Sequence, residues 1–528
     1  MVKMWIVLGE ENGKIKLVSK SPAIGILPKG AFLTIEDENV KHILRVDDSR
    51  QNEPYAPSPL LADMDLSPLK PDQKCQNVLY AYRIGEIGKE TENYISFIYP
   101  QSLARLSNQE EIDTVLKSSS EGPPVFLATV YSGSNKILCD ENGNLIKAFL
   151  PIEMFFHQIL ICGKTGSGKT VASKYLAQFF VEELKKYGAV LAVNVKDIDL
   201  LTMDRPSKSV NSSILKEWES LKKEPHGIDN YTIYYPASTQ IDVKTKVNRE
   251  ICRPITLNVK TLDPDALSGL LVHMISDIAG QHLPNIFRWW QEERRRGRGE
   301  FTFNDFVQHF ENGINDGYVY NTLNSRGQEL TVTLPWGTYQ NVLRSLGTAM
   351  DFFDDPQAQT IEPKDILVRG KMSVINVADS KGIMFGSVIL RHLLKGIVEE
   401  KATGRSETPI LLIIDEVHQF YDTTSSREAL GQLDTICRTG RNKEIGVIFS
   451  SQNPTDIPKG LASVINTTIF FKSDKTLSKN FGLSISSEEI QNLEKGFAVV
   501  NIHGLSQVKV IKFPLSLAGV FEKEAEKN

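Results

Sequence analysis

The chain has 528 residues, of which 41% are hydrophobic and 24% are charged. These proportions are ordinary for a folded protein and exclude a disordered, collagen-like or coiled-coil chain. At roughly 100 to 200 residues per domain, the length predicts about two to four domains. The formal net charge of -5 gives no sign of nucleic-acid binding by the surface as a whole, although a local basic stripe in a channel can bind phosphates whatever the average charge.

The cysteines and the first residues of the chain indicate in which cellular compartment the protein is expected. The five cysteines are scattered, with no C-x-x-C pair and no spacing suited to zinc, which indicates a reduced intracellular protein without a structural metal. The apolar run at the N-terminus is too short for a signal peptide, and no stretch approaches the roughly 18 to 20 apolar residues that span a bilayer. We therefore expect a cytoplasmic protein with no membrane partner.

Residues 1–150 alternate between short apolar runs and turns. This pattern is typical of a small β-barrel or sandwich. The expected strands are Trp5 to Leu8, Lys14 to Val18, Phe32 to Ile35, His42 to Val46 and Asn77 to Tyr82.

The pattern changes to α/β after residue 151. A short apolar run, Gln158 to Cys162, precedes a glycine-rich turn, a helical pattern from Thr170 to Lys186 and a second apolar run from Ala189 to Val195. Strand, loop, helix and strand in this order form a βαβ unit, which implies a parallel sheet. Further expected strands are Tyr231 to Tyr235, Ile255 to Val259, Met372 to Val377, Ile410 to Ile414, Gly446 to Ser450 and Thr468 to Phe471.

A polar, helix-prone stretch interrupts these strands, so we expect one parallel sheet with a mostly helical insertion. The predicted division is an N-terminal β-barrel over 1–150, an α/β core over 151–260 and 355–515, the insertion over 261–354, and a C-terminal tail over 516–528. Within this tail, Glu522 to Asn528 is expected to fray.

The segment GKTGSGKT after the first core strand fits G-x-x-x-x-G-K-[ST] at every position. Its glycines let successive backbone N–H groups curl around a phosphate at the start of a helix. The lysine reaches the β and γ phosphates, and the hydroxyl of the last residue ligates Mg²⁺. The predicted ATP-binding residues are Gly163, Thr165, Gly166, Ser167, Gly168, Lys169 and Thr170.

Such a loop needs a carboxylate at the end of a second buried strand. Ile410 to Ile414 is followed by Asp415 and Glu416, of which the first is predicted to order Mg²⁺ and the second to act as general base on water. The next apolar run leads to Gln452, the candidate sensor of the γ phosphate. The second acid favours hydrolysis over kinase-type transfer.

Two basic segments have different interpretations. In Cys437 to Lys443, an arginine that reaches a neighbouring subunit's ATP site would stabilise the transition state, with Arg441 as first choice and Arg438 as second. The run Arg294 to Arg298 follows Trp289 and Trp290 and could grip phosphates, but a solvated helix end balanced by nearby glutamates is the favoured interpretation.

These motifs resemble, in order and spacing, those of the HerA-like ATPases, in the HerA/FtsK branch of P-loop motor proteins. The similarity rests on GKTGSGKT, IIDEVHQF, RTGRNKEIG and SSQNPTDI, with the N-terminal β region and the segment LEKGFAVVNIHG extending it over nearly the whole chain. The resemblance implies a RecA-like motor domain and a homo-hexameric ring that encircles double-stranded DNA and moves along it using ATP and Mg²⁺. It also implies Arg441 as the residue that acts across the subunit boundary and Gln452 in the sensor position.

Family members often work with a nuclease partner of the NurA type in DNA-end processing, and related bacterial versions pair with sirtuin-like or other nuclease subunits in phage defence. Two departures are visible. After the run ending at Val195, this chain has Lys196-Asp197-Ile198-Asp199 where many relatives carry a D-P-x-G-E turn, so we assign no catalytic role there. His418 is interpreted as a packing residue or as a support for the ATP site.

Three other functions were weighed. Asp415 to His418 also fits the D-E-x-H box of tandem helicases, but the box lies about 246 residues after Lys169, too far for that class. An ATPase ring that scaffolds and activates a partner effector, without processive translocation, needs the same residues and stays open. A transporter or secretion motor is disfavoured because the chain has neither a membrane segment nor an ABC-type signature.

Overall fold

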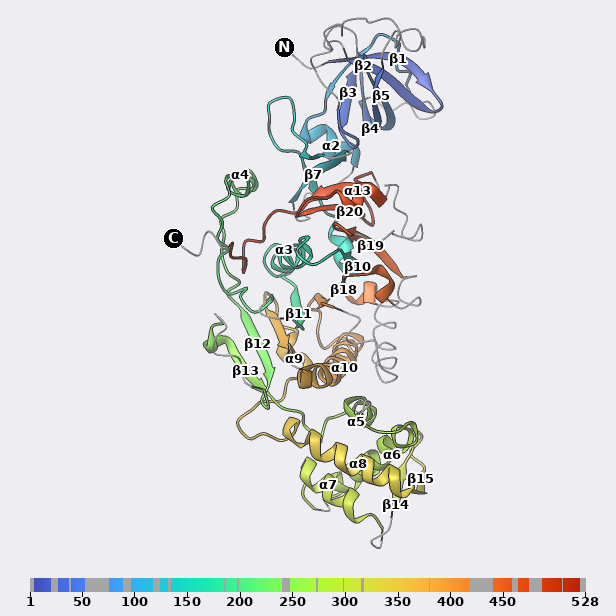
Figure 1. Ribbon diagram of the computed structural model, residues 1–528, viewed down its shortest axis with the longest axis vertical. Helices are drawn as coiled ribbons and strands as arrows, with labels where there is room; N and C mark the ends of the chain where they lie inside the picture. Colours follow the sequence, from blue (N-terminus) through green and yellow to red (C-terminus); the bar gives the residue numbers. More distant parts are fainter. Residues whose placement is uncertain are drawn as a thin grey trace, which may run out of the picture.

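The computed structural model describes residues 4–19, 27–37, 39–52, 76–88, 96–116, 124–131, 134–184, 187–196, 199–239, 247–271, 274–297, 299–314, 318–378, 380–416, 440–457, 464–473, 487–505 and 507–522. The molecule is elongated, with a small barrel at one end, a large sheet in the middle and a mostly helical unit at the other end (Figure 1). This arrangement is the fold that the sequence predicts.

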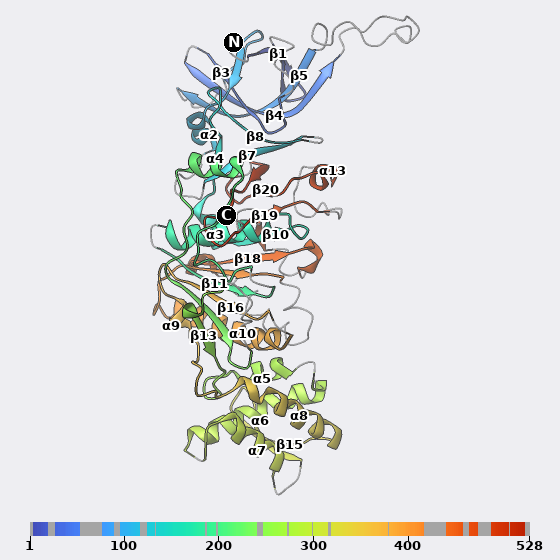
Figure 2. The same cartoon turned by 60° about the vertical axis from the view of Figure 1, so that its left-hand side comes forward.

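The N-terminal strands form a closed barrel (Figure 2), in which neighbouring strands follow the order β1-β2-β5-β4-β3-β6. Inward-facing side chains such as Trp5, Leu17 and Leu33 are completely buried, because alternate residues of each strand point into the barrel. The five expected strands are confirmed, and a sixth, β6, closes the barrel against β1. The bounds are β1 Trp5–Glu11, β2 Lys14–Ser19, β3 Phe32–Glu36, β4 Val40–Asn52, β5 Gln76–Gly88 and β6 Leu103–Leu106.

A buried carboxylate on helix α2 (Gln109–Leu116) ties this helix to the barrel. Glu111 accepts hydrogen bonds from Arg105 at 2.6 Å, from the Thr34 hydroxyl at 2.9 Å and from Lys41 at 3.1 Å. Burial opposes ionisation, but these donors together with the Asn108 backbone N–H lower the pKa of Glu111 to about 2. The barrel therefore contains a fully charged ion cluster at neutral pH.

The central sheet of the described residues has thirteen strands, and its main part is parallel. Eight strands run in the parallel order β13-β12-β16-β11-β17-β18-β10-β19. The bounds are β10 Gln158–Cys162, β11 Ala189–Asn194, β12 Tyr231–Pro236, β13 Cys252–Ile255, β16 Met372–Asn376, β17 Ile410–Ile414, β18 Ile445–Ser451 and β19 Ile465–Phe470. The expected strand Ile255 to Val259 is wrong: the strand ends at Ile255, and the following apolar residues are buried against the insertion.

The remaining strands extend the sheet in antiparallel fashion. They are β20 Phe497–Asn501, β21 Val510–Lys512, β7 Pro124–Tyr131, β8 Ser134–Ile137 and β9 Lys147–Phe149. Strand β7 pairs with β21 near the C-terminus, so residues 124–149, which we included in the N-terminal barrel domain, hydrogen-bond within the central sheet. An alternating strand pattern does not reveal which partner strand it will choose.

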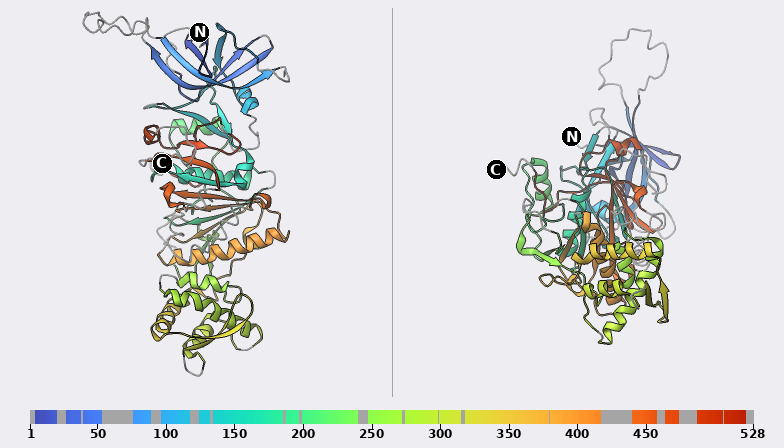
Figure 3. Two further views of the ribbon diagram at one scale, coloured as in Figure 1. Left: turned by 90° about the vertical axis from the view of Figure 1, so that its right-hand side faces the viewer. Right: turned by 60° about the horizontal axis from the view of Figure 1, so that its bottom comes forward.

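Helices cover both faces of the parallel strands. Helix α3 (Lys169–Glu182) packs on one face and the long helix α10 (Ser380–Ala402) on the other, next to the insertion (Figure 3). A hydrophobic core lies on each face of the sheet, and alternate residues of β10 point into one or the other. Ile159 and Ile161 lie on the α3 side, and Leu160 and Cys162 lie on the α10 side. Two buried faces explain why these strands are continuous apolar runs.

The insertion lies beyond α10 and shares its hydrophobic core with that face of the sheet. It is mostly helical, as expected, but also contains a two-stranded hairpin. Its elements are α5 Pro264–Leu271, α6 Asp277–Arg295, α7 Phe303–Asn312, β14 Val319–Leu323, β15 Glu329–Thr333 and α8 Trp336–Ala349. The shorter helices are α4 Ser212–Leu221, α9 Pro363–Ile366 and α13 Ser487–Gln491, with 3₁₀ turns η3 Ile152–Phe156, η4 Arg249–Ile251, η5 Met350–Phe352, η7 Gly440–Lys443 and η8 Pro454–Asp456. Within the described ranges, no helix is both long enough and apolar enough to cross a bilayer.

Candidate ATP site

The glycine-rich segment forms a tight loop between β10 and α3. Gly168 has φ of +117°, and a Cβ at this position would lie 3.1 Å from the backbone nitrogen of Gly496. Glycine is therefore required both by the backbone conformation and by the close approach of the C-terminal turn. The Gly496 N–H donates to the Ser167 carbonyl at 3.0 Å, and the Lys164 N–H donates to the Lys472 carbonyl at 2.8 Å, so neighbouring segments hold the loop at both ends.

Lys169 stands at the start of α3 and folds back over the loop. Its Nζ donates to the carbonyl oxygens of Gly163 at 2.6 Å and Lys164 at 3.1 Å, and the residue is only 7% exposed. Burial lowers the pKa of Lys169, while the charges of Glu416 and Asp415 counteract that effect. The loop thus holds a buried cation at the position where the phosphates are expected.

Asp415 and Glu416 follow β17 at the carboxyl edge of the sheet. Because β17 runs parallel to β11 and β18, and β18 runs parallel to β10, the residues that follow these strands lie at the same edge as the glycine-rich loop. Burial raises the pKa of Asp415, and the neighbouring Glu416 charge adds to the effect, whereas the Ser450 hydroxyl lowers it. A bound cation would favour the ionised form of Asp415.

Two side chains from the flanking strands converge on Glu416. Gln452, just after β18, donates its Nε2 to Glu416 Oε1 at 3.1 Å, and Lys196, just after β11, donates its Nζ to the same oxygen. Glu416 is 3% exposed and has φ of +44°, a left-handed conformation that costs a non-glycine residue roughly 1 to 2 kcal/mol. The structure brings together Lys169, Asp415, Glu416 and Gln452, and adds Lys196, to which we gave no role.

The other predicted site residues are placed as follows. Ser167 is buried, and its Oγ has no hydrogen-bond partner among the described residues; Thr165 is exposed and Thr170 is partly exposed. Arg441 belongs to η7, while Arg438 and His418 lie outside the described residues. The arginine that acts in trans stays a prediction.

The donor set suits magnesium only together with a nucleotide. Among the described residues, no group of three or more His, Cys, Asp or Glu side chains could hold a metal by itself. Mg²⁺ takes oxygen ligands and commonly binds through one or two protein groups plus substrate phosphates and water. The hydroxyl of Thr170 and the carboxylate of Asp415 fit that requirement.

The basic run in the insertion forms ion pairs within its own surface. Arg294 pairs with Asp305, Arg295 with Glu292, and Arg296 with Glu293 at 2.9 Å. The favoured interpretation, a charge-balanced helix end, is confirmed for these three arginines.

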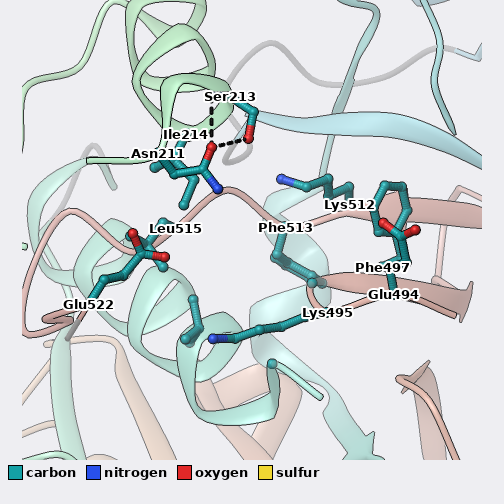
Figure 4. A pocket seen from close by; sticks show the side chains of 13 residues that line it. Asn211, Ser213, Ile214, Glu494, Lys495, Phe497, Lys512, Phe513, Leu515 and Glu522 are labelled. Atoms are coloured by element: carbon teal, nitrogen blue, oxygen red, sulfur yellow. Dashed lines mark hydrogen bonds between the residues drawn. The ribbon is translucent and has the colours of Figure 1, made fainter. Parts of the chain in front are cut away.

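A pocket of about 260 Å³ opens beside the start of α3 (Figure 4). Gly168 and Val171 line it on the side of the ATP loop. The side-chain oxygen Oδ1 of Asn211 accepts from the Ser213 N–H at 3.0 Å and from the Ser213 hydroxyl at 2.8 Å, which leaves the side-chain nitrogen of Asn211 facing the pocket. The other walls come from α4 and the C-terminal strands, and include Ile214, Lys495, Phe497, Lys512, Phe513 and Glu522.

Comparisons with known proteins find similarity to the HerA helicases. The family described as "Helicase HerA-like C-terminal" matches residues 324–470. The "DNA double-strand break repair helicase HerA" of Sulfurisphaera tokodaii is 25% identical over 441 residues, which cover 78% of this chain and 83% of that protein. The HerA helicase of Saccharolobus solfataricus is 23% identical over 144 residues, 25% of this chain and 29% of its own length.

Among solved structures, VirB4 of Thermoanaerobacter pseudethanolicus aligns with a TM-score of 0.43 and 12% identity over 75% of this chain and 97% of VirB4. Residues 324–470 match the HerA-like helicase C-terminal family, and the chain as a whole is a P-loop ATPase similar to the HerA helicases.

Proposed function

We propose that this protein is a Mg²⁺- and ATP-dependent hexameric translocase or helicase that acts on double-stranded DNA in the cytoplasm, together with a nuclease or effector partner. The observation that carries the proposal is the convergence of Lys169, Glu416 and Gln452 at one edge of a parallel sheet, next to a P-loop. The similarity to HerA helicases over most of the chain supports the coupling to DNA. We further propose that the barrel serves ring assembly and the α/β core is the motor.

In the proposed reaction, the backbone N–H groups of the loop and Lys169 hold the phosphates. Thr170 and Asp415 hold Mg²⁺, which when bound neutralises the charge that develops on the phosphates. Glu416 accepts the proton of the attacking water, and Gln452, whose Nε2 donates to Glu416 Oε1, senses the γ phosphate. Arg441 of a neighbouring subunit is proposed to stabilise the transition state, and Arg438 is the second choice.

We assign the pocket beside α3 to the nucleoside part of ATP. The loop holds the α and β phosphates at the helix start, so the sugar and base extend past Gly168 and Val171, which line the pocket. Its volume of about 260 Å³ is slightly below the roughly 300 Å³ at which pockets for whole drug-sized ligands begin, and suits a base and a sugar.

The deciding experiment is steady-state ATP hydrolysis by the full chain, with and without linear duplex DNA, at two salt concentrations. We expect DNA to stimulate turnover in a salt-sensitive manner. Glu416→Gln should bind ATP but lose about 100-fold or more in turnover, since a general base contributes that much. Hydrolysis that is indifferent to DNA, or that begins only when another protein is added, would favour the scaffolding ring over the translocase.

The binding assignments have their own test with tripolyphosphate, which has no nucleoside. Lys169→Ala should weaken both ATP and tripolyphosphate, by roughly 100-fold if the lysine contributes about 2 to 3 kcal/mol. Asn211→Ala and Lys495→Ala should weaken ATP alone, by roughly tenfold. Equal losses for both ligands in the pocket variants would show that the pocket does not hold the nucleoside.

The trans arginine is tested in mixed rings. Arg441→Ala alone should lose turnover, and mixing it with Lys169→Ala subunits should partly restore hydrolysis, because each mutant then supplies what the other lacks. Absence of rescue would contradict a contribution across the subunit boundary.

A further inference from the structure

Lys196 occupies the carboxyl edge of the sheet beside the proposed general base. It comes two residues after β11, and β11 pairs in parallel with β17 so that Val193 lies opposite Ile414. The register therefore sets Lys196 next to Glu416. At this point the sequence departs from the D-P-x-G-E turn that many relatives carry.

Lys196 and Gln452 bind the same oxygen of Glu416. Lys196 Nζ and Gln452 Nε2 both donate to Glu416 Oε1, one from each flanking strand. The Glu416 side chain is 4% exposed and that of Lys196 is 38% exposed, so a solvent-accessible cation reaches in to a buried carboxylate. An oxygen that already accepts two hydrogen bonds has little remaining capacity to orient a water molecule.

Lys196 is also close enough to Lys169 for their positive charges to repel each other. Its positive charge is among the effects that lower the pKa of Lys169, after burial as the main cause. A γ phosphate bound by Lys169 would therefore bring several negative charges close to Lys196 and offer it a second anionic partner.

We propose that Lys196 is a positioning residue that holds Glu416 in a resting arrangement, and that a bound γ phosphate draws the lysine away and releases the carboxylate for the attacking water. This inference rests on the proposed function, in which Glu416 is the general base. Because the γ phosphate competes with Glu416 for the lysine, only part of the ATP-bound sites release the carboxylate, and this limits hydrolysis.

The test compares three variants of the full chain for the turnover number without DNA and, separately, for the dissociation constant of ATP. Lys196→Met removes the cation, and Lys196→Arg keeps it. Lys364→Met is the matched control, because it breaks a similar pair, Lys364 with Glu362 at 2.7 Å, on the exposed surface of α9.

We expect Lys196→Met to raise DNA-independent turnover by about three- to tenfold, as for the release of one partly exposed charge-assisted hydrogen bond. The dissociation constant of ATP should stay within about twofold of the wild-type value, since in the wild type the contact that Lys196 gains with the γ phosphate is offset by the contact that it loses with Glu416. Lys196→Arg and Lys364→Met should hydrolyse ATP at the wild-type rate. A merely structural role for Lys196 would lower turnover and would not be rescued by arginine.

A fall or no change in Lys196→Met, or an equal rise in Lys196→Arg, overturns the proposal. Glu416→Gln separates this failure from that of the proposed function. If Glu416→Gln is inactive and Lys196→Met is slow, only the role of Lys196 is refuted. If Glu416→Gln retains wild-type turnover, Glu416 is not the general base, and the role proposed for Lys196 is refuted as well.

Discussion

Replacing Glu111 by glutamine tests the ion cluster that joins α2 to the barrel. The pKa of Glu111 falls from its ordinary value of 4.5 to about 2, which corresponds to about 3 kcal/mol of stabilisation of the folded barrel. Solvent screens the two cations, because the side chains of Arg105 and Lys41 are 23% and 36% exposed. We therefore expect Glu111→Gln to cost about 2 kcal/mol at pH 7.

The assay is hydrogen exchange, resolved by peptides from β3 and β6, since a chain with several domains does not unfold in a single two-state step. A loss of about 2 kcal/mol should accelerate exchange in these peptides by roughly 30-fold. Glu36→Gln is the control: this neighbour pairs with the same cations but is 56% exposed, so its loss should change stability by less than about 0.5 kcal/mol.

The stabilisation by Glu111 should also depend on pH, in a direction that its shifted pKa predicts. Because the pKa of Glu111 is lower in the folded state, its stabilisation is complete above the unfolded value near 4.5 and is lost as the pH falls toward 2. More than half of it should be gone by about pH 3, after correction for intrinsic exchange rates. Wild-type exchange rates in Glu111→Gln at pH 7, or a difference that persists undiminished at pH 3, would refute the reasoning.

Three further predictions concern the ATP site and its surroundings. Gly168→Ala forces a side chain into a left-handed backbone against Gly496, and should weaken ATP binding by roughly tenfold in calorimetry. Gln452→Ala removes the side chain proposed to sense the γ phosphate, and should lower turnover by about tenfold with ATP affinity nearly unchanged in a binding titration. Burial lowers the pKa of Lys174, whose Nζ donates to the Gly519 carbonyl at 2.6 Å, to about 8. Because the unfolded chain binds more protons above that pH, the melting temperature should rise between about pH 8 and 10, and Lys174→Met should abolish the rise.

The P-loop and the acidic strand end could be predicted because each is a contiguous motif. A glycine-rich turn between an apolar run and a helix specifies its own geometry, so the loop around Lys169 follows from local sequence. The proximity of Gln452 to Glu416 also followed, since neighbouring strands of a parallel sheet end at the same edge.

The pair between Lys196 and Glu416 depends on register between strands that are 220 residues apart in sequence. The sequence predicts no role for Lys196, because it departs here from the turn that many relatives carry and because it does not show that β11 pairs with β17. A usable signal existed: a lysine two residues beyond a fully buried core strand must lie at the edge where the predicted site forms. The sequence likewise does not predict that β7 pairs with β21. Alternating apolar and polar residues show which face of a strand is buried, but they do not show which strand lies beside it.

Backbone hydrogen bonds connect β7 to the nucleotide loop through the C-terminal strands. Strand β7, which continues from the barrel, pairs with β21; β21 pairs with β20; and the turn before β20 donates its Gly496 N–H to Ser167 in the P-loop. These backbone hydrogen bonds run without interruption from β7 to the phosphate-binding turn. We therefore expect a displacement of β7 to strain the P-loop, and we expect a chain truncated before β21 to lose this linkage even if its catalytic residues are intact.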